Sequence, residues 1–268
     1  MSEHVIHAEI ELTRCAAELS VNGIPLRRKS HPGDRFASLA AHQYLVGGDN
    51  RLELLIEPGP TPSRARAVEE RTRVMPGSAA IARIVRYEAG GFANHEEGEV
   101  LAEVKWEGEA DTRESFPKSV GATVTLGSRS RWSWQDAPPL TLDEATRAEI
   151  EDVLSTVGRC FERGDPAPLL RLLGPRFDEG IRAYPVNDRE TLTRELSAYV
   201  NEVAHDGWKV RPLDPEGFDF RLCAGDRMVE LVDRDWLPSL RFFAPDEPEP
   251  YGYVMFLARI DGRLAIVR

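Results

Sequence analysis

The segment RWSWQDAPPLTLDE, residues 131–144, separates two kinds of sequence. Before it, short apolar runs alternate with polar residues and are interrupted by Gly, Pro, Asn and Asp, which is typical of strands joined by turns. After it, apolar residues recur at intervals of three and four, the spacing of an amphipathic helix. We therefore predict a last β-strand over residues 130–135, a connector stiffened by Pro139, and a helix that starts at Thr141.

The predicted fold class is α+β with two domains in a chain of 268 residues. We expect an antiparallel β-sandwich over residues 1–137, a linker over 138–141, and a domain of helices followed by a curved sheet over 142–268.

Period-two alternation places the strands of the first half. In the first of them Ile6, Ala8, Ile10 and Leu12 share one face, and the intervening polar residues share the other. Asn22-Gly23 is a strong signal for a hairpin turn. Residues 39–46 are ambiguous and include a possible single helical turn, and residues 61–76 are expected to form a mobile loop. The predicted strands cover residues 5–12, 15–21, 24–28, 52–56, 79–87, 99–107 and 121–126.

Two phrases of the first half, VNGIPL and YLVGGDNRLELLIEP, resemble the N-terminal half of galactose-binding-like jelly-roll domains. Leu45, Gly48, Asn50 and Leu52 follow the order of leucine, glycine, asparagine and leucine found there. The resemblance covers about 35 residues and consists mostly of turn chemistry, so it implies a fold and transfers no ligand site.

Capping and termination signals place three helices in the second half. Thr141 and Glu144 have the form of a capping box, and Gly164 ends the first helix. Asp165-Pro166 starts a second helix that Gly174-Pro175 is expected to stop, and a third spans about 188–204. The predicted strands that follow cover residues 208–210, 218–224, 227–233, 240–243, 251–258 and 263–267.

This order, with the F-x-x-G-D phrase at residues 161–165 and DGRLAIV near the end, resembles the cone-shaped NTF2-like (SnoaL-like) family, a cystatin/NTF2-like arrangement. The resemblance covers roughly residues 145–268. Its members include isomerases, cyclases, dehydratases and binding domains, so the resemblance implies a cavity between helices and sheet without selecting a function.

Charge and composition exclude several function classes. The net charge of −11 is uneven: residues 1–140 hold 17 basic and 20 acidic side chains (−3), and residues 141–268 hold 17 and 25 (−8). Nucleic-acid binders carry a basic face, so no nucleic-acid partner is expected. The chain has no apolar run long enough for a membrane helix, and its first residues do not resemble a signal peptide. Three widely spaced cysteines are expected to be buried thiols, which with the missing signal indicates the cytoplasm.

Aromatic and polar residues of the second half are the candidates for a ligand pocket. Aromatic residues at helix or strand spacing are also ordinary core residues, and Arg241 is alternatively an outward-facing residue of an exposed strand. His205 is alternatively a cation placed at the C-terminal end of a helix. The candidates are Tyr184, Tyr199, Phe220, Trp236, Arg241, Phe243, Tyr253 and His205.

An acidic, proline-interrupted run with nearby aromatic residues is the candidate surface for a basic protein partner; the alternative is a solvated loop. Its members are Asp233, Asp235, Asp246, Glu247, Glu249 and Tyr251.

We find no zinc-type ligand spacing, phosphate-binding loop, nucleophile elbow or carboxylate–histidine dyad, so no catalytic residue, cofactor or metal is predicted. The leading hypothesis is a non-catalytic binding protein, an adaptor or immunity-type protein acting through its acidic second half. The alternatives are a small-molecule enzyme or carrier that uses the second-half cavity, and glycan binding through Trp132 and Trp134. The oligomeric state is left open.

Overall fold

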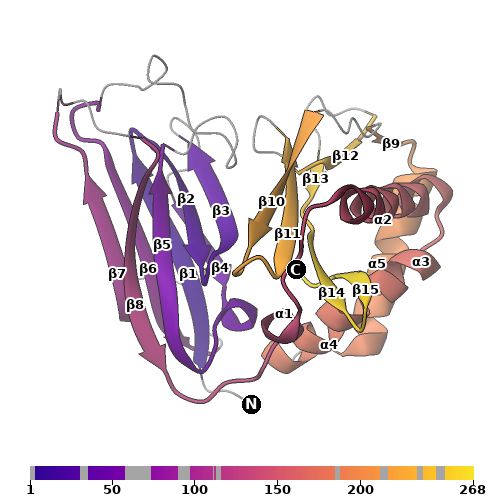
Figure 1. Cartoon of the computed structure of the whole chain (residues 1–268), viewed down its shortest axis with the longest axis horizontal. Helices are drawn as coiled ribbons and strands as arrows, with labels where there is room; N and C mark the ends of the chain where they lie inside the picture. The colour runs from indigo at the N-terminus through magenta and orange to yellow at the C-terminus, as the bar shows by residue number, and fades with distance from the viewer. Residues whose placement is uncertain are drawn as a thin grey trace. The chain divides into compact units, whose positions relative to one another are not determined.

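The computed structural model describes residues 4–30, 36–57, 74–89, 97–110, 112, 116–184, 188–211, 217–233, 238–245 and 251–268. The chain divides into two compact units, which we call unit 1 (Met1–Arg131) and unit 2 (Trp132–Arg268). Helices and antiparallel sheets are both present, as the predicted α+β class requires (Figure 1).

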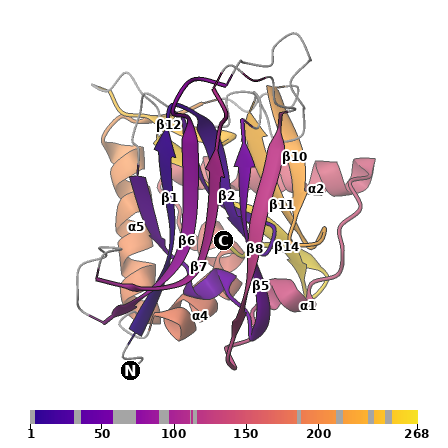
Figure 2. The same ribbon diagram turned by 90° about the vertical axis from the view of Figure 1, so that its left-hand side faces the viewer.

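Unit 1 consists of two four-stranded antiparallel sheets, ordered β4-β1-β6-β7 and β3-β2-β5-β8. The sheets stack on one another (Figures 1 and 2), and apolar residues from both, such as Ile10 of β1 and Leu54 of β5, form one core. Two stacked sheets with a shared core are compatible with the predicted sandwich. The elements are β1 (His4–Thr13), β2 (Ala16–Val21), β3 (Ile24–Ser30), β4 (Phe36–Ala40), the 3-10 turn η1 (His42–Tyr44), β5 (Gly48–Ile56), β6 (Ala79–Glu88), β7 (Glu99–Glu107) and β8 (Lys118–Leu126).

The turn residues of unit 1 explain its register. Asn22 and Gly23 have φ angles of 53° and 72°, the left-handed values that a two-residue hairpin turn needs. Asn50 is buried and uses its whole amide. Its Oδ1 accepts from Val46 N (2.7 Å) and Asn22 Nδ2 (2.9 Å), and its Nδ2 donates to the carbonyls of Val46 and Gly48 (both 2.9 Å). These bonds join the hairpin turn to the turn that precedes β5.

Unit 2 begins with helices and continues with two antiparallel sheets, ordered β10-β11-β14-β15 and β13-β12-β9. The helix α2 buries Ile150, Leu154, Val157 and Phe161, the apolar stripe that the sequence predicts, in a core shared with the strands. The elements are α1 (Ser133–Asp136), α2 (Glu144–Arg163), α3 (Ala167–Leu172), α4 (Gly174–Ala183), α5 (Arg189–His205), β9 (Lys209–Val210), β10 (Phe218–Cys223), β11 (Met228–Asp233), β12 (Leu240–Phe243), β13 (Tyr251–Tyr253), β14 (Phe256–Ile260) and β15 (Arg263–Ile266).

Two local predictions are wrong, and one helix was not predicted. Residues 130–135 do not form a strand, because the short helix α1 starts at Ser133. The cap of α2 is Asp143, whose carboxylate accepts from Thr146 N at 2.8 Å, and not Thr141. The second helix, α3, does end just before Gly174-Pro175 as predicted, but the same two residues start the unpredicted helix α4, because a proline fits the first turn of a helix as well as the residues after one.

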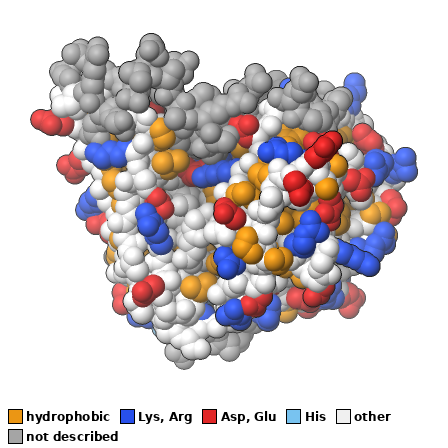
Figure 3. All heavy atoms as spheres, viewed as in Figure 1, with side chains coloured by type: hydrophobic (Ala, Val, Ile, Leu, Met, Phe, Trp, Pro, Cys, Tyr) orange, Lys and Arg blue, Asp and Glu red, His pale blue; other side chains and the backbone are white. Residues whose placement is uncertain are grey.

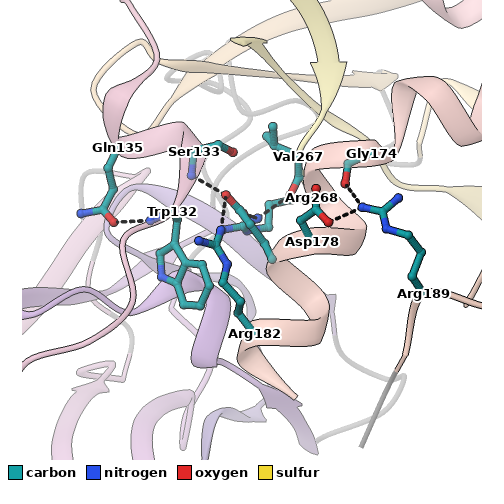
Figure 4. A network of polar contacts seen from close by, with 10 residues as sticks. Trp132, Ser133, Gln135, Gly174, Asp178, Arg182, Arg189, Val267 and Arg268 are labelled. Atoms are coloured by element: carbon teal, nitrogen blue, oxygen red, sulfur yellow. Dashed lines mark hydrogen bonds and ion pairs between the residues drawn. The ribbon is translucent and has the colours of Figure 1, made fainter. Parts of the chain in front are cut away.

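A buried ion pair joins α4 to the last residue of unit 2 (Figure 4). Glu179 of α4 and Arg268 are 1% and 4% exposed; the guanidinium of Arg268 donates to Glu179, and Ser133 N donates to the same carboxylate. The guanidinium groups of Arg182 and Arg268 lie 5.7 and 5.8 Å from the Trp132 ring centroid, within cation–π range. These contacts fix α1 and α4 to the end of the sheet.

Candidate functional site

Aromatic side chains gather on one face of the β13-β12-β9 sheet. Leu240 faces Tyr253 and Phe242 faces Tyr251 across the β12–β13 pair, and directly opposite residues share a face of a sheet. Leu240 and Phe242 belong to the core of unit 2, so this is the face that packs on the core. Both tyrosines therefore point to the core side.

Phe161 of α2 is the centre of this group. Its ring centroid lies 4.5 Å from that of Phe242 and 5.6 Å from those of Tyr199 and Tyr253, with the two tyrosine rings edge-on. Such tilted and edge-to-face pairs are favourable arrangements of aromatic rings. At the rim, Trp208 contacts Tyr251, with 5.2 Å between ring centroids. We call the set Phe161, Tyr199, Trp208, Phe242, Tyr251 and Tyr253 the aromatic wall.

Exposure increases across the aromatic wall. Phe161 and Phe242 are 0% and 1% exposed, Tyr199 and Tyr253 are half-buried, and Tyr251 is 45% exposed. The hydroxyls of Tyr199 and Tyr253 have no hydrogen-bond partner among the described residues, and neither is among the unpartnered polar atoms shut off from solvent. Neither hydroxyl is therefore completely shut off from solvent, so each can bond to water.

The two phenol hydroxyls are protonated at neutral pH and can donate hydrogen bonds. Burial raises the pKa of Tyr253, an effect that the positive charge of Arg176 opposes and Tyr199 reinforces. Burial also raises the pKa of Tyr199, and the carboxylate of Glu202 adds to this. Since an ordinary tyrosine already titrates near pH 10, both hydroxyls keep their protons at pH 7.

The structure brings only some of the predicted pocket residues together. Tyr199 and Tyr253 meet at Phe161, whereas Arg241 alternates with Leu240 and Phe242 and so points to the opposite face of β12. Arg241 is nevertheless 7% exposed, so its interpretation as an outward residue of an exposed strand is wrong.

The remaining candidates lie elsewhere. Tyr184 caps the C-terminal end of α4, and His205 is the exposed last residue of α5, the position of a cation that interacts with the helix dipole. Phe220 lies on β10 with the Arg147 guanidinium 4.6 Å from its ring centroid, and Phe243 is half-buried on β12. Trp236 lies outside the described residues.

The acidic partner surface is mostly outside the described residues too: Asp235, Asp246, Glu247 and Glu249 all fall there, as do most of the predicted loop residues 61–76. Asp233 ends β11, and its side chain is not described. Tyr251 is exposed, with Val254 (50% exposed) close by in sequence. On the face drawn in Figure 3, acidic and basic side chains of unit 2 are intermixed.

The glycan hypothesis loses the two side chains on which it depended. Trp132 and Trp134 are 3% and 6% exposed, because α1 packs into unit 2 and does not continue a sheet. Stacking on a sugar needs an exposed indole face, which neither residue offers.

Unit 1 contains a buried polar cluster that the sequence did not indicate. Glu9 was expected on the polar face of its strand, yet it is 1% exposed. Its Oε1 accepts hydrogen bonds from Ser38 Oγ (3.0 Å) and from the Tyr87 hydroxyl, and His7 Nδ1 lies 2.8 Å from Ser38 Oγ. A side chain at Gly98 would collide with the Tyr87 ring, so the backbone there packs closely against Tyr87. Burial lowers the pKa of His7 and raises that of Tyr87.

Other functional classes receive no support from the described residues. No group of three or more His, Cys, Asp or Glu among them is arranged to hold a metal ion. Cys15, Cys160 and Cys223 are buried and none is in a disulfide, which confirms the predicted buried thiols. Within the same residues, no helix is both long and apolar enough to cross a membrane.

Comparisons with protein-family models, with curated proteins and with solved structures find no match to this chain.

Proposed function

We propose that the protein binds a small molecule at the aromatic wall of unit 2. The observation that carries this proposal is the pair of phenol hydroxyls of Tyr199 and Tyr253, which are not completely shut off from solvent, are unbonded to described residues, and belong to rings that pack against Phe161. Ligand sites are mostly apolar surfaces with a few fixed polar groups, and the wall has this composition.

The order of the elements also supports the proposal. Helices α2 to α5 precede the sheets of unit 2, as in the NTF2-like arrangement that the sequence resembles, and ligands are expected there between helices and sheet. The wall is formed by α2, α5 and the β13-β12-β9 sheet, together with Trp208 just before β9. Phenols and indoles position a ligand through hydrogen bonds and ring contacts, so we propose binding and transport, not catalysis.

A thermal-shift screen of small ring compounds, followed by calorimetric titration, tests this proposal. Loss of one net hydrogen bond should weaken a true ligand about tenfold in Tyr253→Phe and in Tyr199→Phe. Tyr44→Phe, a phenol of unit 1, is the matched control and should leave the affinity unchanged. The proposal is wrong if ligands bind with equal affinity to the wild type and to both wall variants.

A second candidate is the binding of a basic protein segment near Tyr251. It is favoured by the exposure of Tyr251 and Val254 and by the charge of −8 over residues 141–268. Exposed aromatic residues are frequent anchors of interfaces. Titration with an arginine-rich peptide at low and high salt separates the two candidates, because peptide binding should weaken with salt and be lost in Tyr251→Ala. This second candidate is wrong if the peptide binds Tyr251→Ala with the same affinity as the wild type.

A further inference from the structure

In three dipeptides of the chain a glycine follows an asparagine or an aspartate: Asn22-Gly23, Asp206-Gly207 and Asp261-Gly262. The glycine nitrogen can attack the side-chain carbonyl carbon of the residue before it, because glycine has no side chain to hinder the approach. A five-membered succinimide ring forms, with loss of ammonia from asparagine or of water from aspartic acid. Water then opens the ring at either carbonyl, and one of the two products is isoaspartate, whose peptide bond runs through the side chain.

Chemistry alone favours Asn22-Gly23 as the first of the three pairs to react. Aspartate side chains are ordinarily ionised at neutral pH, and a carboxylate carbon is a poorer electrophile than the neutral carboxamide of asparagine. In every case ring closure requires the side chain and the following nitrogen to rotate toward each other. Hydrogen bonds that hold the side chain therefore slow the reaction, and the three pairs differ in such bonds.

Asn22 is held at both polar atoms of its side chain. Its Oδ1 accepts from Arg51 N (2.9 Å), and its Nδ2 donates to Tyr44 O (2.8 Å) and to Asn50 Oδ1 (2.9 Å). Its backbone N–H donates to Arg51 O at 2.8 Å. The carboxamide cannot turn toward Gly23 N without breaking its three side-chain hydrogen bonds, so the fold protects the most reactive of the three pairs.

Asp261 has no such restraint on its side chain. It is exposed in the two-residue turn between β14 and β15 (Figure 1), and among the described residues its carboxylate has no hydrogen-bond or ion-pair partner. A Cβ atom added at Gly262 would have nothing within 4 Å except the adjacent residues. Arg259 Nη1 donates to Gly262 O at 3.2 Å, but this carbonyl takes no part in ring closure.

Asp206 is the same dipeptide in a more restricted place. It is exposed, and its carboxylate has no partner within the described part of the chain. However, it is the C-cap of α5, and its backbone N–H donates to Glu202 O at 2.9 Å. A Cβ atom added at Gly207 would lie 3.5 Å from the Pro245 ring. Asp206-Gly207 is therefore an internal comparison for Asp261-Gly262.

We propose that Asp261-Gly262 is the first of the three pairs to form isoaspartate in the folded protein, and that Asn22-Gly23 is protected. Isoaspartate would insert Cβ of Asp261 into the backbone of a turn that has only two residues. Leu264 and Ile266, which follow in β15, belong to the core of unit 2, so the modification should weaken that unit.

Prolonged incubation of the full chain at neutral pH, followed by peptide mapping that separates aspartate from isoaspartate, tests the proposal. The same chain in concentrated guanidinium chloride is the unfolded reference, in which Asn22 should react first. In the folded chain isoaspartate should appear first at Asp261, and conversion of Asn22 should be at least about tenfold slower than in the reference. Deamidation changes the mass of the Asn22 peptide, whereas isomerisation of an aspartate does not.

Two variants separate the effects of side chain and fold. Asp261→Glu keeps the charge but would have to close a six-membered ring, so the signal at this turn should vanish while that at Asp206 is unchanged. Asn50→Ala removes one partner of the Asn22 carboxamide and should speed the conversion of Asn22 in the folded chain.

The proposal is wrong if Asn22 or Asp206 gives isoaspartate before Asp261 in the folded chain, or if Asn22 converts equally fast in the folded and unfolded chains. It is also wrong if Asp261 stays unmodified over an incubation in which the unfolded chain is largely converted there.

Discussion

Asn50 in unit 1 and Tyr253 in unit 2 are two polar side chains in largely apolar surroundings, and they differ in how many hydrogen bonds the protein makes to them. The amide of Asn50 is buried and makes four hydrogen bonds, all to neighbouring turn residues. The hydroxyl of Tyr253 makes none to a described residue and is not completely shut off from solvent. The Asn50 amide links two turns of unit 1, whereas the Tyr253 hydroxyl can bond to water or to a ligand.

This difference separates structural polar groups from candidate functional ones. Buried polar groups are almost always bonded, because an unmet donor or acceptor costs about 1–3 kcal/mol. A hydroxyl that is open to water avoids this cost and can exchange water for a ligand. By this criterion the turns of unit 1 and the Glu179–Arg268 pair are structural, and the aromatic wall is where we propose that a ligand binds.

The largest effect is expected where a bonded polar group in unit 2 is removed. Glu179→Ala leaves the buried Arg268 guanidinium without its carboxylate, and breaking a buried pair in this way costs about 3–5 kcal/mol. Denaturant unfolding followed by tryptophan fluorescence measures it, because Trp132 lies against this pair. Asp178→Ala is the control: its pair with Arg189 is exposed and should contribute less than about 1 kcal/mol. Equal effects of the two variants would contradict the assignment.

A somewhat smaller loss is expected in unit 1. Asn50→Ala removes four hydrogen bonds and leaves Val46 N without its acceptor, which should cost about 2–4 kcal/mol in the free energy of unfolding. Asp49→Ala, at the adjacent position of β5, loses an exposed bond to Thr125 and should change stability by less than about 0.5 kcal/mol. Measurement of both by denaturant unfolding tests whether the amide, and not the turn in general, carries the stability.

The sequence predicts strands and amphipathic helices well, because these depend on local periodicity. The alternation of β1 and the apolar stripe of α2 both appear in the structure with nearly the predicted bounds. The helix α4 was missed because Gly174-Pro175 is equally compatible with a helix end and a helix start. Without α4 the Glu179–Arg268 pair cannot be anticipated, since it depends on where that helix packs.

The candidate site was predicted in part for a similar reason. Aromatic type and the spacing along helix and strand indicate Tyr199 and Tyr253 but do not show that both contact Phe161, which depends on the packing of α2, α5 and the sheet. Strand alternation does predict that Tyr251 and Tyr253 share a face, a signal that would have placed Tyr251 on the wall. The buried Glu9 is bonded by Ser38 and Tyr87, which lie 29 and 78 residues later in the chain, and no local pattern predicts these contacts.

A pH effect of intermediate size should come from His42 in unit 1. Its Nε2 accepts a hydrogen bond from Ile6 N (2.9 Å), and burial lowers its pKa to about 4, with the nearby Arg129 and His7 acting in the same direction. The unfolded chain binds a proton near pH 6.5 and the folded chain only near pH 4, so stability falls as pH drops from about 6.5 to 4 and then levels off.

The loss should be about 1–2 kcal/mol, less than the full shift implies, because the His42 ring is partly exposed and solvent screens it. His42→Gln keeps an acceptor for Ile6 N and should remove this part of the pH dependence. The difference between the two unfolding profiles isolates it from the carboxylates, whose contributions are common to both. A His42→Gln profile parallel to that of the wild type would show that His42 does not titrate in this range.

The smallest effect is the sharpest test of the comparison between bonded and unbonded polar groups. Tyr253→Phe removes a hydroxyl that bonds to no described residue, so the free energy of unfolding should change by less than about 0.5 kcal/mol while the pair of rings at Phe161 is kept. The same substitution in unit 1, Tyr87→Phe, takes a hydrogen bond from the buried carboxylate of Glu9 and should cost about 1–3 kcal/mol. Denaturant unfolding compares the effects of these two identical chemical changes on the free energy of unfolding.

If Tyr253→Phe is as destabilising as Tyr87→Phe, the Tyr253 hydroxyl is a structural group and no longer supports a ligand site at the aromatic wall. If it is neutral, the hydroxyl is retained for a reason other than stability, and binding is the reason that its contact with solvent supports.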